Sequence, residues 1–194
     1  MSKICYFDLE TKYTFAELEK SWDSLSYSQK EAIRGELIPK MGMATSCVIS
    51  EDKPKEAIFF DEGDEEQLIS TLDSFDTIIG HNLLHFDYFV LSPYYKHDII
   101  NYFEKKTIDT LDYLHKRTRK FIKLDDLAKN NLNLEKIMNP IDAPRMWREG
   151  YKEEVRKYCR SDVELVREIY LIGIRKKSLF YTDKGLLREV RVEW

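Results

Sequence analysis

Short apolar runs, each of strand length and bounded by charge or glycine, recur along this sequence and set its architecture. Three of them come first, over residues 3–9, 42–50 and 56–61. Two more, over 76–80 and 106–109, alternate with segments of helical periodicity. Consecutive strands followed by strand–helix alternation predict an α/β fold, in which a mixed sheet has helices on both faces.

The segment between the first two predicted strands carries two helix-start signals. Thr14 with Glu17, and Ser26 with Gln29, have the spacing of a capping box, in which two side chains satisfy backbone amides reciprocally. These pairs predict two short helices in an insertion over about 12–40. The sequence leaves open whether this insertion is a lid or a packed element.

Helical periodicity also follows the later strands. The predicted helices cover residues 65–72, 83–91, 110–119, 124–130 and 152–170. Beyond them, residues 178–194 alternate around Lys184-Gly185, which predicts a C-terminal β-hairpin. No Pro/Gly/Ser-rich linker divides the chain, so we expect one domain over residues 1–194.

The composition predicts a folded, cytoplasmic protein. Hydrophobic residues make up 43% and charged residues 34% of the chain. The sequence contains no apolar run of about 18 residues, so we expect no membrane span. Cys5, Cys47 and Cys159 are widely spaced, which predicts reduced thiols and neither a disulfide framework nor a zinc site. The net charge of -4 argues weakly against a protein that grips long duplex DNA, because an acidic metal cluster would itself add negative charge.

An acidic pair ends the first predicted strand. Asp8 and Glu10 are two residues apart, so strand alternation places both side chains on one face of the sheet. Adjacent carboxylates repel unless a cation neutralises them. Such a pair also arises by chance at a solvated strand end, since 35 residues are acidic. Its place after an apolar strand, where α/β proteins bind ligands, favours a functional site.

A further aspartate lies in the segment GHNLLHFD, residues 80–87. Gly80 ends a predicted strand, and Asp87 follows in an apolar helix, where a buried carboxylate needs a partner. Asp87 belongs either to a polar helix face or to the same cation site. His81 and His85 share a helical face, but no cysteine or third histidine is close enough in sequence to favour zinc.

The stretch YCRSD, residues 158–162, completes the set. On a helix, Tyr158 and Asp162 are i and i+4 and share a face. Alone, this spacing fits an ordinary surface pair equally well. Its weight comes from the order of the motifs: Asp-x-Glu on the first strand, Gly-His-Asn and Phe-Asp at the fourth strand and next helix, and Tyr-x-x-x-Asp on a late helix.

This ordered set resembles the DnaQ-like 3′–5′ exonucleases of the ribonuclease-H-like superfamily, in their DEDDy branch. FDLET at 7–11, GHNLLHFD at 80–87 and YCRSD at 158–162 match the three motifs. The histidine branch would have a histidine where this chain has Lys157. A closer similarity is to a largely uncharacterised set of prokaryotic ribonuclease-H-like exonuclease domains. It rests on the segments TKYTFAELEKSW and KMGMA and on the ending RVEW. The resemblance implies a mixed five-stranded sheet.

The resemblance also implies hydrolysis of phosphodiester bonds at single-stranded 3′ ends with two metal ions. The implied metal ligands are Asp8, which would bridge the ions, and Glu10, Asp87 and Asp162. Carboxylate and water ligands suit Mg²⁺ or Mn²⁺ and not zinc. Two such ions activate a water and stabilise the leaving oxygen. Tyr158 would orient that water, because a tyrosine pKa of about 10 makes it a poor base at neutral pH.

Substrate contacts are expected beside these motifs. By resemblance, the candidate contacts to the 3′-terminal nucleotide are Leu9, Thr11, Asn82 and Phe86. Core packing explains Leu9 and Phe86 equally well. The basic run KRTRKFIK, residues 116–123, is either a phosphate track or a solvated helix face. Asp109 either lies near the site or caps a helix.

Three functions fit these observations. The first is an active exonuclease whose partner is single-stranded DNA or RNA. The second is a nucleic-acid-binding module that no longer cleaves, which the intact carboxylate set disfavours; association with a helicase or polymerase is compatible with both. The third is a hydrolase of short oligonucleotides or nucleotides. The choice between DNA and RNA depends on how the site treats a 2′-hydroxyl, and no motif here encodes it.

Overall fold

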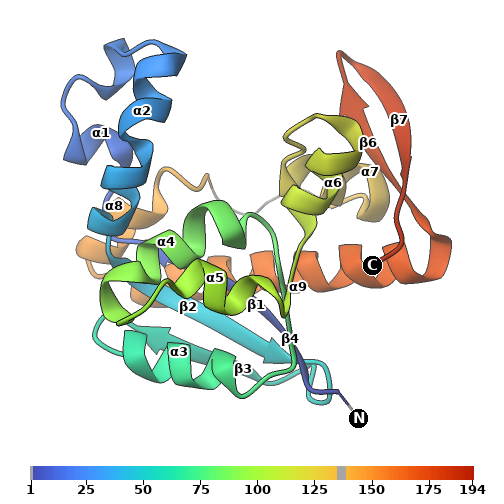
Figure 1. Cartoon of the computed structure of the whole chain (residues 1–194), viewed down its shortest axis with the longest axis horizontal. Helices are drawn as coiled ribbons and strands as arrows, with labels where there is room; N and C mark the ends of the chain where they lie inside the picture. The colour runs from blue at the N-terminus through green and yellow to red at the C-terminus, as the bar shows by residue number, and fades with distance from the viewer. Residues whose placement is uncertain (1, 135–138) are drawn as a thin grey trace.

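The computed structural model describes residues 2–134 and 139–194, which contain a five-stranded mixed sheet (Figure 1). In the order β3-β2-β1-β4-β5, the strands are Ala57–Asp61, Met43–Ser50, Ile4–Thr11, Thr77–Gly80 and Thr107–Asp109. β1 pairs antiparallel with β2 and β2 with β3, whereas β1–β4 and β4–β5 are parallel. The predicted mixed sheet is confirmed. The predicted single domain includes residues outside this description and stays a prediction.

Helices cover both faces of the sheet. The α-helices are α1 Phe15–Leu18, α2 Tyr27–Leu37, α3 Glu65–Asp73, α4 Tyr88–Leu91, α5 Ile99–Glu104, α6 Thr110–Thr118, α7 Leu124–Leu132, α8 Ala143–Arg148 and α9 Lys152–Lys176. Shorter turns are η1 Trp22–Ser24, η2 Ile38–Lys40, η3 Leu83–Asp87 and η4 Ser92–Tyr94. Within the described ranges, none of these helices combines the length and apolar character needed to cross a membrane.

Alternation along β1 divides the core into two layers. Phe7 and Leu9 join a cluster with residues of α3, α4 and α5 on one face. Tyr6 points to the opposite face and packs with residues of α7 and α9. Figure 1 shows the sheet between α3–α5 and the long helix α9. The same alternation directs the side chains of Asp8 and Glu10 toward α9.

The C-terminal hairpin is confirmed. β6 Ser178–Asp183 and β7 Leu186–Arg191 pair antiparallel around Lys184 and Gly185. Both turn residues have positive φ, 52° and 77°, as a tight hairpin turn requires. The hairpin closes a third core cluster with side chains from α6, α7 and α9. It therefore holds α6 and α7 next to the sheet, where they flank the end of β1.

The insertion has the two predicted helices. Both capping boxes form: Thr14 and Glu17 start α1, and Ser26 and Gln29 start α2. Figure 1 shows α1 and α2 standing beyond the sheet on one side, with α6, α7 and the hairpin on the other. Capping signals could be read from the sequence because each involves residues three apart in the chain.

Several predicted elements differ from the structure. The helical conformation predicted over 83–91 is confirmed, but it is divided into a π-helical turn, η3, and the α-helix α4. An apolar run of this kind gives no period that separates the two conformations. Asp64 is the residue before α3, but its carboxylate accepts from the amide of Asp61 and does not cap the helix. The sequence also predicted neither α5 nor α8, and α9 continues to Lys176.

Candidate metal centre

Three carboxylates meet between β1 and α9. Asp8 and Glu10 come from the end of β1, and Asp162 comes from the facing side of α9. One oxygen from each lies within 4.8 Å of the others. Glu10 and Asp162 are buried, with 9% and 4% of their surfaces exposed, and Asp8 is half-buried. Carboxylates held this close in a partly dry site repel, and a divalent cation would relieve that repulsion.

Asp87 approaches the same strand from η3. Its Oδ1 accepts the backbone N–H of Leu9 at 3.1 Å. β4 pairs with β1 only as far as Tyr6, so the carboxylate satisfies an amide beyond the end of that ladder. Burial, and then the nearby Asp109 carboxylate, raise the pKa of Asp87 to about 8. Asp87 lies outside the tight group of three and lines the same cleft.

The turn before Asp87 is held by a buried aspartate that the sequence left ambiguous. Asp109 accepts the amides of Asn82 at 2.8 Å and Leu84 at 2.9 Å. It is also the N-cap residue of α6. Asp109 therefore fulfils both predictions made for it, since it lies near the site and caps a helix. Asn82 has a left-handed φ of 78°. At Gly80, an added Cβ would lie 2.4 Å from the Leu83 side chain, so the strand must end in glycine here.

The histidines of this segment have different partners. His81 Nδ1 lies 2.9 Å from the Thr110 hydroxyl, which itself donates to the Gly80 carbonyl. His85 Nε2 lies 3.6 Å from a carboxylate oxygen of Asp112. Within the described residues, neither histidine joins a group of three or more metal-ligating side chains. The arrangement gives no support to a zinc site.

Tyr158 and Cys159, neighbours on α9, pack into different core clusters. The Tyr158 side chain is buried beside Ala44 and Trp147 and lines the cleft. Burial, followed by the carboxylates of Glu10 and Asp162, raises the pKa of Tyr158 far above its ordinary value. The phenol therefore keeps its proton. Cys159 Sγ donates to the Asp8 carbonyl at 3.5 Å.

These groups line one cleft of about 520 Å³. Its lining includes all five predicted catalytic residues: Asp8, Glu10, Asp87, Tyr158 and Asp162. Leu9, Asn82 and Phe86, predicted to contact the terminal nucleotide, also line it. Thr11 does not; its buried hydroxyl donates to the Tyr13 carbonyl at 3.0 Å. The structure thus gathers the predicted residues except Thr11, and their roles stay predictions.

Comparison with known proteins supports the fold. The sequence matches no protein-family model and no curated protein. The structure is similar to that of the family B DNA polymerase from the hyperthermophilic archaeon Pyrobaculum calidifontis, with a TM-score of 0.59. The fold is ribonuclease-H-like. The match covers 90% of this chain and 25% of the polymerase chain at 12% identity, so it concerns the fold alone.

The basic run, residues 116–123, mostly contacts its own neighbours. Lys116 pairs with Asp112 at 2.7 Å, and the Arg117 guanidinium lies 3.7 Å from the centre of the Tyr113 ring. Lys120 pairs with a carboxylate of the hairpin at 3.1 Å. Lys123 lines the cleft. The run is therefore neither a continuous phosphate track nor a uniformly solvated helix face.

Two further lining residues were not singled out by the sequence analysis. Asp125, in the first turn of α7, lies in the cleft with the other acids, and Phe121 lies at its mouth with 68% of its surface exposed. The sequence signals were the basic run, which contains Phe121, and the place of both residues between the second and third motifs. A prediction would have needed the position of α7 across the sheet, which depends on the hairpin.

Proposed function

We propose that this protein is a 3′–5′ exonuclease that hydrolyses phosphodiester bonds at single-stranded nucleic-acid ends with divalent metal ions. The observation that carries the proposal is the approach of Asp8, Glu10 and Asp162 oxygens within 4.8 Å in a cleft. Asp87 and Tyr158 line that cleft, so the ordered motifs of the sequence converge in space. The fold is the one that the resemblance implied.

The donor set fits divalent ions that prefer oxygen. Asp8, Glu10, Asp87 and Asp162 would hold Mg²⁺ or Mn²⁺, two ions by resemblance to the DEDDy enzymes. Within the described residues, the cluster of Asp8, Glu10 and Asp162 includes no thiol, which disfavours zinc. Such ions lower the pKa of a water and stabilise the oxygen that leaves the phosphodiester. The buried carboxylates would gain most from them, because burial makes an uncompensated charge costly.

The protein's own groups then orient the reactants. The Tyr158 hydroxyl keeps its proton and positions the attacking water by hydrogen bonding, not as a base. Leu9 and Phe86 provide apolar contact to the terminal nucleotide, and Asn82 is presented by its left-handed backbone. Asp109 holds Asn82 and Leu84 by their amides and acts as a positioning residue.

The size of the site and the net charge of the chain favour a strand end over a duplex. A cleft of about 520 Å³ falls within the range of small-ligand pockets, about 300–1,000 Å³. A net charge of -4 is unusual for a protein that grips a long duplex. Single strands are bound by stacking and a few cations. The same site would serve in a larger assembly with a helicase or polymerase, and copurification would reveal such a partner.

The direct test uses 5′-labelled single-stranded DNA and RNA with Mg²⁺ or Mn²⁺. We expect a ladder that shortens from the 3′ end, is abolished by EDTA and is absent in Asp162→Asn. Glu164→Gln, two residues further along α9 on its exposed side, is the matched control and should cleave normally. Binding of both strands without cleavage would reject the enzyme and support the non-cleaving module.

A further inference from the structure

A second cavity of about 720 Å³ adjoins the proposed cleft. Asn82, Leu111 and Phe121 line both, so the two spaces meet along one edge. The far wall of the second cavity is α2, from the insertion, which contributes Tyr27 and Arg34. A chain that enters the cleft from this side would pass between α2 and α6.

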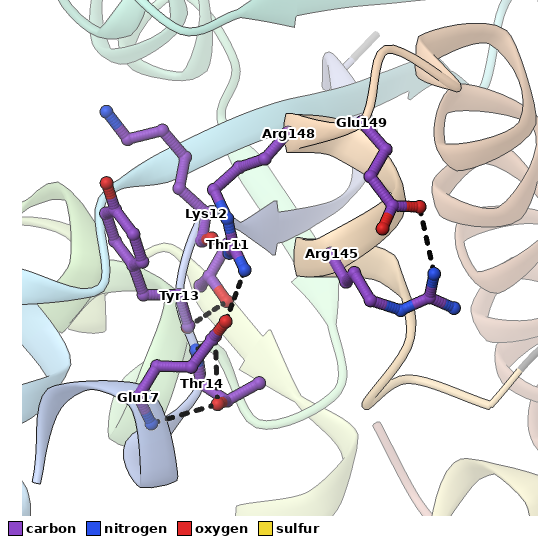
Figure 2. Close-up of polar contacts among 8 residues, drawn as sticks. All are labelled: Thr11, Lys12, Tyr13, Thr14, Glu17, Arg145, Arg148 and Glu149. Carbon is purple, nitrogen blue, oxygen red and sulfur yellow. Dashed lines mark hydrogen bonds and ion pairs between the residues drawn. The ribbon is translucent and has the colours of Figure 1, made fainter. Parts of the chain in front are cut away.

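The insertion is anchored near both of its ends. At its start, Arg148 of α8 donates to the Lys12 carbonyl and pairs with Glu17 of α1 (Figure 2). The Arg148 guanidinium also lies 5.0 Å from the centre of the Tyr13 ring. At its end, Ile38 is buried in the main core. The insertion is therefore attached to α8 at its start and to the main core at its end, and α2 between them forms one wall of the second cavity.

An exposed aromatic ring, Phe121, lies where the two spaces meet. Phe121 is 68% exposed and stacks on His115, with ring centres 4.2 Å apart and planes 12° from parallel. Across the cavity, Tyr27 is 74% exposed. A rigid, exposed ring backed by a second ring offers a platform for a nucleobase, because every base has an aromatic face.

The charged groups of the cavity nearly balance. Lys116 is paired with Asp112, so its charge is already compensated. Arg34 and Glu31 also line the cavity, on α2, and the Arg34 guanidinium lies 5.4 Å from the centre of the Phe15 ring. The described ion pairs do not include Arg34. A cavity of this kind favours stacking with one cationic contact over a phosphate track.

We infer that the second cavity binds the nucleotide that precedes the 3′-terminal one, with its base stacked on Phe121 and its phosphate next to Arg34. The inference rests on the proposed function and gives the insertion a role in substrate binding. The strand then occupies both spaces: the terminal nucleotide in the carboxylate cleft and its neighbour between α2 and α6. Substrates of one nucleotide leave the second space unfilled.

The test compares an oligonucleotide with a minimal substrate, the methyl ester of a nucleoside 5′-monophosphate, whose leaving group has no ring that could stack in the second cavity. Phe121→Leu keeps an apolar side chain and removes the ring, whereas Phe121→Tyr keeps the ring. We expect Phe121→Leu to lower kcat/KM for the oligonucleotide about tenfold more than for the ester, the effect of one lost stack. Phe121→Tyr should keep kcat/KM for both substrates close to the wild-type values. Equal effects of Phe121→Leu on the two substrates, or no effect, would overturn the inference.

A second pair of variants tests the wall itself. Arg34→Gln should raise KM for the oligonucleotide, whereas Lys30→Gln is the control, because Lys30 lies on the same helix near the Trp22 ring and outside the cavity lining. Equal KM values for the two variants would count against the inference. If the wild type cleaves neither substrate, the proposed function fails. The subsite is then tested by oligonucleotide binding in Ca²⁺. Weaker binding by Phe121→Leu supports the subsite, and unchanged binding rejects it.

Discussion

Two buried aspartates lie near each other in this molecule and are treated oppositely by their surroundings. Asp109, at the end of β5, accepts four backbone amides, those of Asn82, Leu84, Leu111 and Asp112. Asp87, at the end of η3, accepts the Leu9 amide, and its pKa is raised to about 8. A carboxylate saturated by amides is a scaffold, whereas one that burial destabilises is ready for a cation. Variants of the two aspartates and a change of pH separate these roles.

The largest expected effect is on activity in Asp87→Asn. Loss of a metal ligand should lower kcat about 1,000-fold, equivalent to about 4 kcal/mol. The same change should stabilise the metal-free protein by about 1–3 kcal/mol, because it removes a charge that burial disfavours. Cleavage rates and urea unfolding in EDTA measure the two effects. Destabilisation comparable to the activity loss would make Asp87 a structural residue.

Asp109→Ala should give the opposite profile. Leaving four amides without their acceptor should lower the free energy of unfolding by about 2–4 kcal/mol. Asp109→Asn keeps Oδ1, which accepts three of the four amides, so it should cost less than the alanine variant. Urea unfolding of both variants in EDTA provides the comparison. Equal stability of the alanine variant and the wild type would contradict the scaffold role.

Tyr158→Phe should lower kcat by roughly 10- to 100-fold, since it removes a positioning hydrogen bond and leaves the ring in place. Because burial and the adjacent carboxylates raise its pKa, the hydroxyl does not titrate in the working range. The pH–rate profile of the variant should therefore keep the shape of the wild-type profile. A limb of the profile that disappears with the hydroxyl would show that Tyr158 acts as a base.

The last expected effect is the pH dependence of the free energy of unfolding without metal. The folded-state pKa of Asp87, about 8, lies above its ordinary value of 3.8, so the folded state binds the proton more tightly than the unfolded state. Stability contributed by this group is present below about pH 4 and is lost as the pH rises toward 8. In EDTA, the free energy of unfolding should decline less steeply with pH in Asp87→Asn than in the wild type. Identical slopes for the two proteins would contradict this prediction.

Local patterns predicted much of this structure. The capping boxes of the insertion, the Lys184-Gly185 turn and the shared face of Asp8 and Glu10 each depend on residues a few positions apart. The order of three motifs located the carboxylates because the parallel strands β1 and β4 bring their ends to the same edge.

The remaining features depend on distant segments. Arg148 and Glu17 are 131 residues apart, so their contact could not be read from the sequence. The same is true of Asp109, whose partners come from η3 as well as α6. The wall that α2 forms opposite α6 also needs the fold. Thr11 was predicted to contact substrate from its position in a motif, but its hydroxyl donates to the Tyr13 carbonyl and does not line the cleft.

The measurement that tests the metal centre most directly is anomalous scattering from crystals grown with Mn²⁺ and a nucleoside 5′-monophosphate. The account predicts anomalous density within coordination distance of Asp8, Glu10 and Asp162, with the phosphate beside it. The density should vanish in crystals of Asp162→Asn. Manganese located elsewhere on the molecule, or no bound manganese despite an ordered nucleotide in the cleft, would contradict the account.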